Sequence, residues 1–335
     1  MNLPQLYYFK KLAEVQHYTR AAKELYITQP TLSNSISQLE RELGVPLFER
    51  ENRAVHLTRY GREFYKYITQ ALNMLDKGID VAHEHAGSLS GSIEIGTIYT
   101  IQGDYLPALI AGYRAQYGDS VTTNIYQGLS RPLIEGLCED RYEIAFAAFV
   151  PDKPQLTFVP MFTQQLVVIM QESNPLAQKD SISFSDLQGV SKLYSYPAEA
   201  PIGAEVAALI KPHGLTITPP FYNDEITLAS VIDSDEEAVG LSLNTIGLVP
   251  FKDKLVTKPI AGVPVDFHPI YMVYKTSAFK TRTLETFIEH AKSFVWTDVP
   301  RLAIPTDEEE GEGEGAEGEG SAEKKAEEVV ASVVA

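Results

Sequence analysis

The first 58 residues combine short apolar stripes with polar and helix-breaking positions. The clearest stripe has spacings of four, three and four residues, which predicts one buried helix face: Leu32, Ile36, Leu39 and Leu43. Pro30 is typical of the first turn of such a helix and Gly44 of its end. Two earlier stripes predict helices near residues 3–13 and 19–25, and the looser pattern of residues 45–58 predicts a small β-wing.

A long segment without proline follows, from Tyr60 to Ala86. As a helix it would span about 40 Å at 1.5 Å per residue. Apolar residues recur along it in two rows, and the main row is the set expected to pair with a second copy of the chain: Phe64, Ile68, Leu72, Leu75 and Ile79. Packing of this helix on its own domain is the alternative. The glycine- and serine-rich residues 88–91 predict a hinge.

Beyond residue 92, strand-like and helix-like patterns alternate. The first half is expected to contain strands at 93–98, 121–126 and 143–149, with helices near 102–116 and 132–138. A second cycle runs through 192–196, 202–211, 221–223, 226–232 and 238–243. This rhythm is typical of parallel sheets covered by helices. Residues 156–170 and 267–274 would cross between the two halves, and 282–295 would form a closing helix.

The formal net charge of −17 is unevenly distributed along the chain. Residues 1–66 carry ten basic and seven acidic side chains, residues 67–305 sixteen and twenty-seven, and residues 306–335 two and eleven. Because an acidic surface repels nucleic acid, only the N-terminal segment is a candidate for binding it. Residues 301–335 are acidic and poor in apolar side chains, which predicts a disordered tail.

Several classes of protein are excluded or disfavoured by what the sequence lacks. A single cysteine, Cys138, excludes an internal disulfide framework and a zinc site with several thiolates, and it fits a reducing compartment. No apolar run is long enough for a signal peptide or a membrane-spanning helix, so we expect a cytoplasmic protein with no membrane partner. Phosphate-loop, dinucleotide-binding, zinc-protease and nucleophile-elbow motifs are missing. We therefore expect no enzyme activity, no catalytic residue, no cofactor and no metal site.

A short helix, a turn and a second helix with a polar N-terminal face form the helix-turn-helix arrangement, here near residues 18–37, whose second helix can lie in the major groove. Residue spacing makes the chain resemble the LysR-type transcriptional regulators. The resemblance is carried by Thr19, Ala21, Ala22, Leu25, Gln29, Pro30, Ser33, Ile36, Leu39, Glu40, Leu43, Gly44, Leu47, Phe48, Arg50, Leu57, Thr58 and Gly61. It covers residues 1–300, tightly over the first 62 and by architecture beyond them. Tyr18, where the family often has a smaller residue, and the acidic tail depart from it.

The resemblance implies that the N-terminal module binds double-stranded DNA. The candidate contacts are Gln29, Pro30, Thr31, Ser33, Asn34, Ser37, Arg50, Arg53, Thr58 and Arg62. Gln29 and Asn34 can pair with the edge of an adenine. Arg50 and Arg53, near the wing tip, suit a narrow minor groove, whereas Thr58 and Arg62 would hold phosphates. Glu40 is expected to be a structural partner of a nearby basic residue.

The α/β region resembles the effector-binding domain of the same family, which is built like periplasmic solute-binding proteins with two lobes and a cleft. Ligands of open α/β sheets bind beyond the C-terminal ends of the strands. This rule selects Thr97, Tyr99, Thr100, Ser130, Phe149, Tyr196, Asn223 and Thr227 as candidate contacts. A helix N-terminus after the first strand favours an anion, and Arg131 is the one cation close to the candidates, so a small carboxylate is the expected effector.

The predicted architecture is therefore a multidomain α+β chain. It comprises a winged helix-turn-helix (1–59), a dimerisation helix (60–87), a hinge (88–91), a two-lobed α/β domain (92–300, with lobe one at 92–162 and 267–300 and lobe two at 163–266) and the tail (301–335). The predicted function is sequence-specific transcriptional regulation in response to a small-molecule effector, by a homodimer or homotetramer. The alternative is a solute-binding protein of the two-lobed periplasmic type without a role in DNA binding.

Overall fold

The computed structural model describes residues 1–51, 54–85, 89 and 91–296. The predicted tail, Ser88 and Ser90 of the predicted hinge, and Arg53 lie outside the described residues. Leu89 and Gly91 of the hinge are described, and Gly91 is the first residue of a strand.

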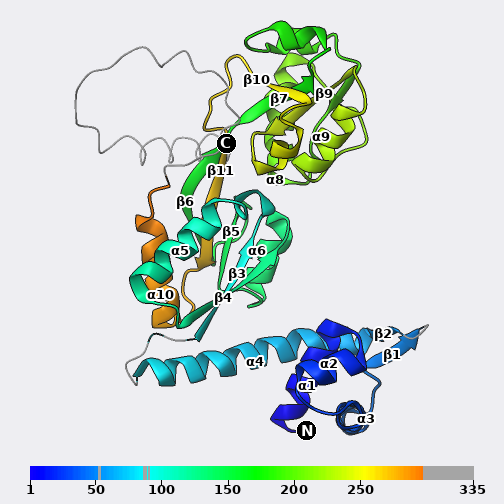
Figure 1. Ribbon diagram of the computed structural model, residues 1–335, viewed down its shortest axis with the longest axis vertical. Helices are drawn as coiled ribbons and strands as arrows, with labels where there is room; N and C mark the ends of the chain where they lie inside the picture. The colour runs from blue at the N-terminus through cyan, green and yellow to red at the C-terminus, as the bar shows by residue number, and fades with distance from the viewer. Residues whose placement is uncertain (52–53, 86–88, 90, 297–335) are drawn as a thin grey trace. The chain divides into compact units, whose positions relative to one another are not determined.

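The N-terminal domain contains the three helices and the wing that the sequence predicts (Figure 1). The helices are α1 (Leu3–Val15), α2 (Tyr18–Glu24) and α3 (Gln29–Leu43), and the wing is an antiparallel pair of β1 (Phe48–Glu51) and β2 (Ala54–Leu57). The hydroxyl of Thr28 caps α3 by accepting a hydrogen bond from the backbone N–H of Thr31, and Gly44 ends α3 in the left-handed conformation with φ of 73°. The predicted stripe is buried in the domain core, apart from Leu43.

The long helix α4 (Arg59–His85) corrects the prediction for dimerisation. Ile68 and Leu72 are buried, and Phe64 is partly buried, in the core that α4 forms with the other helices of its own domain. Helix α4 packs along α1 of the same chain, and these three side chains face that contact. They therefore pack within one chain and are not available to a partner. Leu75 and Ile79 are 39% and 45% exposed and remain available to a partner. They lie beside a more exposed apolar row, which contains Tyr67, Ala71 and Met74.

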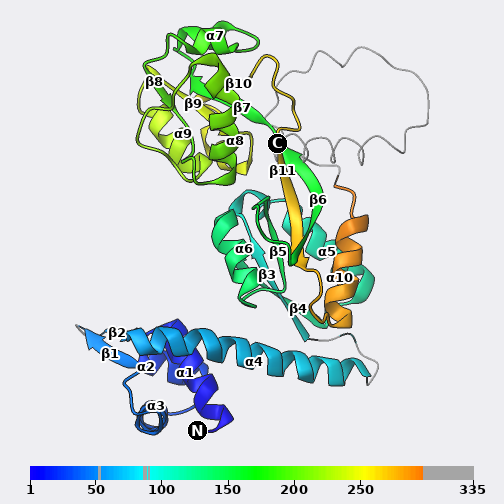
Figure 2. The same ribbon diagram turned by 180° about the vertical axis from the view of Figure 1, so that it is seen from behind.

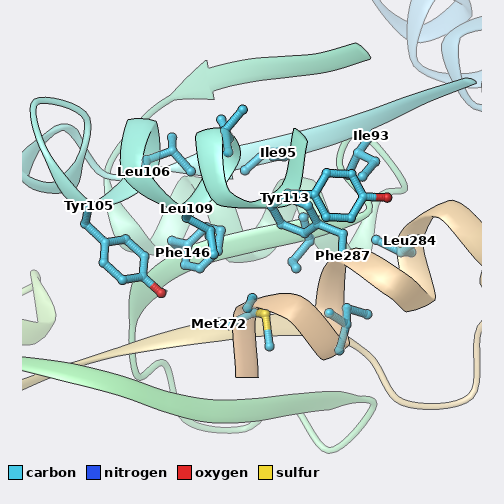
Figure 3. Packing of buried hydrophobic residues seen from close by; sticks show 14 of the residues in the cluster. Ile93, Ile95, Tyr105, Leu106, Leu109, Tyr113, Phe146, Met272, Leu284 and Phe287 are labelled. Carbon is cyan, nitrogen blue, oxygen red and sulfur yellow. The ribbon is translucent and has the colours of Figure 1, made fainter. Parts of the chain in front are cut away.

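Lobe one is built on a five-stranded sheet with the order β4-β3-β5-β11-β6 (Figures 1 and 2). Its strands are β3 (Gly91–Thr97), β4 (Val121–Gln127), β5 (Ile144–Ala148), β6 (Leu156–Gln164) and β11 (His268–Lys275), and its helices are α5 (Tyr105–Tyr117), α6 (Ser130–Cys138) and α10 (Arg282–Ser293). Alternate residues of β5 face opposite sides of the sheet. Phe146 packs with α5 and α10, as Figure 3 shows, whereas Ala145 and Ala147 pack with α6.

Lobe two is built on a four-stranded sheet with the order β10-β7-β9-β8. Its strands are β7 (Leu166–Gln171), β8 (Lys192–Tyr194), β9 (Ala238–Leu243) and β10 (Leu255–Pro259). Its α-helices are α7 (Phe184–Leu187), α8 (Pro201–Ile210) and α9 (Glu225–Asp233). Short 3-10 helices also occur: η1 (Tyr99–Ile101) in lobe one, and η2 (Pro175–Gln178), η3 (Lys211–His213) and η4 (Ile246–Phe251) in lobe two.

Two predictions about the sheets need correction: that the sheets are parallel, and that residues 221–223 form a strand. Both sheets are mixed, because strand β11 returns antiparallel between β5 and β6, and β7 pairs antiparallel with β9 and β10. Residues 221–223 form no strand, and strand β10 was not predicted. The expected crossing segments are confirmed, but residues 156–170 form two strands in different sheets, which meet at Gln165.

Candidate DNA-binding surface and effector pocket

Helix α3 presents its polar residues on the face opposite to the buried stripe. Pro30, Thr31, Asn34 and Ser37 are exposed, and Gln29 and Ser33 are partly exposed. The helix begins at Gln29, so these side chains occupy its first three turns. Because the N-terminal part of a recognition helix is the part that contacts base edges, this surface has the position and the donor and acceptor groups that base readout requires.

Two of the predicted phosphate contacts are engaged within the domain. The hydroxyl of Thr58 donates to the backbone oxygen of Pro46 at 2.7 Å and accepts from the backbone N–H of Gly61 at 3.0 Å. Its single hydrogen is therefore used, and Thr58 is a structural residue at the start of α4 rather than a free donor. Arg62 donates through Nη1 to the oxygen of Leu57 at 2.7 Å, which leaves other guanidinium N–H groups for a phosphate.

Glu40 has a structural role, but not with the expected basic partner. Its Oε1 accepts hydrogen bonds from the backbone N–H groups of Leu47 and Phe48, at 2.7 Å and 3.0 Å. Glu40 therefore fixes the entry of the wing relative to helix α3. Arg50 lies in β1, with its Cα opposite that of Val55.

Tyr26 is a candidate DNA contact that the sequence did not reveal. It lies in the turn between α2 and α3, is 97% exposed, and has a positive φ of 56°. A bulky residue in this conformation is uncommon and is strained by local sterics. Its hydroxyl can donate to a phosphate, and the signal in sequence was weak because tyrosine is ordinarily read as a core residue.

A cavity of about 380 Å³ lies between the two lobes. Lobe one contributes η1 and the start of α6, and lobe two contributes the starts of α8 and α9 together with Tyr196 and Pro197. Gln164 and His268 line it from the two crossing strands, where they are register partners. The cavity therefore touches both lobes and the strands that connect them.

The structure brings five of the eight predicted effector contacts to this cavity: Tyr99, Thr100, Ser130, Tyr196 and Asn223. The other three lie elsewhere. Thr97 is fully buried, and its hydroxyl donates to the oxygen of Ile98. Phe149 packs against Phe158 and Tyr271.

The third misplaced residue, Thr227, is exposed and donates through its hydroxyl to Asp224, which caps α9. The rule that ligands bind beyond strand ends selected residues of the sheet edges that border this cavity. It could not tell which way each side chain points.

The starts of α6 and α8 lie close together at the cavity. No described side chain caps either helix, and Arg131 of α6 donates through Nε to the backbone oxygen of Glu199, just before α8, at 2.6 Å. The first N–H groups of each helix have no partner within the helix. Two helix N-termini and one guanidinium therefore contribute positive potential at this end of the cavity, which Glu199 also lines.

A buried hydrogen-bond network forms another part of the wall. The hydroxyl of Tyr196 donates to Oε1 of Glu225 at 2.7 Å, and the backbone N–H of Glu225 donates to the hydroxyl of Tyr99 at 3.1 Å, across the lobes. Burial raises the pKa of Glu225 to about 8, so this carboxyl is largely protonated near neutral pH.

Glu225 and Gln164 were missed at the sequence level. An acidic residue after Asp224 resembles an ordinary first-turn residue of a helix, and its burial depends on the packing of lobe one against lobe two. Among the residues that the structure describes, no cluster of three or more histidine, cysteine or acidic side chains could hold a metal ion. No helix in the same part of the chain is long and apolar enough to cross a membrane.

A winged helix-turn-helix joined by a long helix to a two-lobed binding domain defines a class of DNA-binding regulator. Residues 3–62 match the bacterial regulatory helix-turn-helix protein family, lysR type, and residues 86–295 match the LysR substrate binding domain. The chain belongs to the LysR family of transcriptional regulators. The helix-turn-helix match argues against the alternative of a solute-binding protein without a role in DNA binding.

Individual relatives agree with this assignment. The HTH-type transcriptional regulator BenM of Acinetobacter baylyi is 30% identical over 272 residues, which cover 78% of this chain and 88% of BenM. The uncharacterized HTH-type transcriptional regulator YybE of Bacillus subtilis is 31% identical over 189 residues, or 56% of this chain. That alignment spans 64% of YybE, just under two thirds of its length.

Solved structures share the fold. CbnR, a LysR family transcriptional regulator, matches with a TM-score of 0.66 at 22% identity, over 87% of this chain and 98% of CbnR. The effector binding domain of QuiR in complex with shikimate matches with a TM-score of 0.55 at 19% identity, over 60% of this chain and 95% of that domain.

Proposed function

We propose that this chain is a sequence-specific transcriptional regulator that binds double-stranded DNA through helix α3 and responds to a small molecule bound between its lobes. The observation that carries this proposal is the exposed polar face of α3, which begins at Gln29 and lies opposite a buried apolar stripe. Membership of the LysR family supports it. Because the DNA of a bacterial cell is in the cytoplasm, we infer a cytoplasmic location, and we infer that regulation rather than catalysis is the activity.

A gel-shift experiment with the DNA upstream of the chain's own gene tests this proposal. We expect a shifted complex that survives competition by random DNA and weakens as salt rises, since phosphate contacts release counterions. Equal competition by specific and random DNA would contradict sequence-specific binding.

We propose that the functional unit is a homodimer, or a tetramer of two dimers, assembled through the exposed row of α4. Tyr67 and Met74 are 72% and 63% exposed, which is unusual for two large apolar side chains on one helix face. A dimer would place two α3 helices on successive turns of one duplex and raise the affinity of the modestly cationic module. Size measurement in solution tests this arrangement.

We propose that the effector is a small carboxylate bound near the starts of α6 and α8. The uncapped helix N-termini and Arg131 favour a negative charge there, and the hydroxyls of Thr100 and Ser130 line the same cavity. The proposal is supported by the effector binding domain of QuiR, which shares this fold and was solved in complex with shikimate. A sensor based on a disulfide within one chain is not available here, because Cys138 is the single cysteine of the sequence.

Substitution at the cavity tests the effector site. Thr100→Val keeps the shape of the side chain and removes its hydroxyl, so the DNA footprint should no longer change when effector is added, while binding of DNA without effector should persist. A normal response of Thr100→Val to the identified effector would place the site elsewhere. The coupling between effector and DNA is expected to be about 1 to 3 kcal/mol.

A further inference from the structure

We propose that Glu225 and Gln164 determine effector specificity by binding a hydroxyl or ammonium group, so that the effector combines a carboxylate with a hydrogen-bond donor. This inference rests on the effector cavity proposed above and names the chemistry that the cavity selects.

Glu225 is the first residue of α9 and is 3% exposed. Oε1 of its carboxyl accepts from the Tyr196 hydroxyl, whereas Oε2 is buried and makes no hydrogen bond of good geometry with any described residue, although the Thr245 side chain lies near enough to offset part of the rise in pKa that burial causes. Buried polar atoms are almost always paired, since an unpaired one loses its hydrogen bonds to water without replacement. Because Glu225 lines the cavity, a ligand group that reaches its carboxyl is a candidate partner for Oε2 beside the Thr245 hydroxyl.

Gln164, at the end of β6, shows the same pattern and is 8% exposed. Its Nε2 donates to the hydroxyl of Thr100 at 3.0 Å, but its Oε1 is buried and has no hydrogen-bond partner within the described part of the chain. Thr100 follows Tyr99, whose hydroxyl accepts from the backbone of Glu225. Both unpaired oxygens therefore belong to residues that hydrogen-bond to neighbouring residues of η1, Gln164 through its side chain and Glu225 through its backbone N–H.

The remainder of the cavity fits a ligand with two polar ends. The starts of α6 and α8 favour a carboxylate, as argued above, and Ile98, Leu129 and Ile202 provide apolar walls. A hydroxyl near η1 would accept from the protonated carboxyl of Glu225 and donate to Oε1 of Gln164. An ammonium group would donate to both oxygens and displace the proton of Glu225. An unsubstituted methylene group would leave both oxygens unpaired.

The two donor groups differ in their response to pH. The ionisable groups near the Glu225 carboxyl are Tyr196 and Tyr99, the capping residue Asp224, and, around the cavity, Arg131, Glu199 and the His268–Glu205 pair. Since burial raises the pKa of Glu225 to about 8, an ammonium ligand must displace a proton below that pH. Its affinity should increase between about pH 6.5 and 8.5, whereas the affinity of a hydroxyl ligand should not.

Three matched probes test the proposal with the full chain by isothermal titration calorimetry. They are cyclohexanecarboxylate, 3-hydroxycyclohexanecarboxylate and 3-(aminomethyl)cyclohexanecarboxylate, which share the carboxylate and ring and differ in the donor. We expect at least one donor-bearing probe to bind about tenfold more tightly than the parent acid, and its pH dependence assigns the donor as hydroxyl or ammonium. Equal affinity for all three probes, or binding of none, would overturn the proposal.

Substitutions at Glu225 and Gln164 test whether these residues cause the preference for a donor-bearing probe. Glu225→Gln keeps the acceptor for Tyr196 and places an NH₂ donor where the carboxyl carries its proton, so the preference for the ammonium probe should fall to within about twofold, whereas the hydroxyl probe, which accepts at that position, should keep its preference. Gln164→Met removes the second oxygen at similar volume and should reduce the preference for either donor-bearing probe, which keeps the test valid if Glu225→Gln does not fold. The control Glu172→Gln makes the same chemical change at an exposed position outside the cavity and should keep the preference. Retention of the preference in both cavity variants would overturn the proposal.

Gel shifts without any probe separate this inference from the proposed function. Probe selectivity without sequence-specific DNA binding would contradict the regulator and retain the specificity residues. Sequence-specific DNA binding without probe selectivity would support the regulator and contradict the role of Glu225 and Gln164 in specificity.

Discussion

Leu72 and Met74 lie two residues apart on α4, but the structure assigns them opposite roles. Leu72 is 1% exposed and packs in the N-terminal core with residues that include Phe9 and Leu12, whereas Met74 is 63% exposed. We predict that Leu72→Ala destabilises the N-terminal domain with little direct effect on assembly, and that Met74→Glu disrupts assembly with little effect on stability.

The magnitudes follow from burial. Removing three carbons of a fully buried leucine costs about 2 to 5 kcal/mol, and the upper half of that range applies where neighbouring helices cannot collapse into the space. For a domain of 60–100 residues, a loss of about 3 kcal/mol lowers the melting temperature by roughly 12 to 24 °C. Met74→Glu exchanges one good helix former for another on an exposed face, so the free energy of unfolding of the N-terminal domain should change by no more than about 0.5 kcal/mol.

In a symmetric dimer the same substitution acts twice, because each interface residue occurs on both sides. An unpaired buried charge costs several kcal/mol, so the dissociation constant of Met74→Glu should rise by at least about 100-fold. Sedimentation velocity over a range of concentrations measures assembly, and hydrogen exchange of α1 measures the stability of the N-terminal domain within the full chain. An unchanged oligomer in Met74→Glu, or unchanged protection of α1 in Leu72→Ala, would refute the assignment.

Three further predictions concern the wing, the effector cavity and base readout. A Cβ at Gly61 would lie 2.0 Å from the backbone oxygen of Leu47, so Gly61→Ala must shift the backbone. The substitution should lower the free energy of unfolding, measured by urea denaturation, by about 1 to 3 kcal/mol. A variant as stable as the wild type would contradict this close contact. In the folded chain Glu225 keeps its proton up to a pKa of about 8, whereas in the unfolded chain the carboxyl loses it near its ordinary pKa of 4.5. The melting temperature of the wild type should therefore fall relative to that of Glu225→Gln from about pH 5 to 8, and the difference should stay constant at higher pH. Parallel melting curves over the whole pH range would show that this carboxyl ionises normally. Gln29→Ala should reduce the binding free energy on specific DNA by roughly 1 to 3 kcal/mol and relax base preference, whereas Arg62→Ala should weaken binding to all sequences alike. Equal losses of affinity on specific and random DNA for Gln29→Ala would exclude base readout by this residue.

Local sequence was sufficient for the N-terminal domain. The stripe from Leu32 to Leu43, the cap at Thr28 and the stop at Gly44 are all signals within a few residues of one another. Such signals act through backbone conformation and helical periodicity, which do not depend on distant segments. The same reasoning gave the order of most strands and helices in both lobes.

The mixed character of the sheets could not be obtained in this way. Strand direction depends on which neighbour a strand pairs with, and β11 pairs with β5 and β6 from more than a hundred residues away in the chain. Periodicity identifies a strand without indicating its partner.

Burial in particular required the tertiary structure. On α4, apolar residues at helical spacing predicted a contact surface, but only packing against α1 decides that Leu72 belongs to the core and Met74 to the surface. In the cavity, strand ends indicated Thr100 and Ser130, whereas Glu225 and Gln164 acquire their unpaired oxygens because the two lobes enclose them. Sequence by itself determined which segments form helices, strands and a helix-turn-helix. The tertiary structure decided which polar groups lose contact with water, because that depends on every segment packed around them.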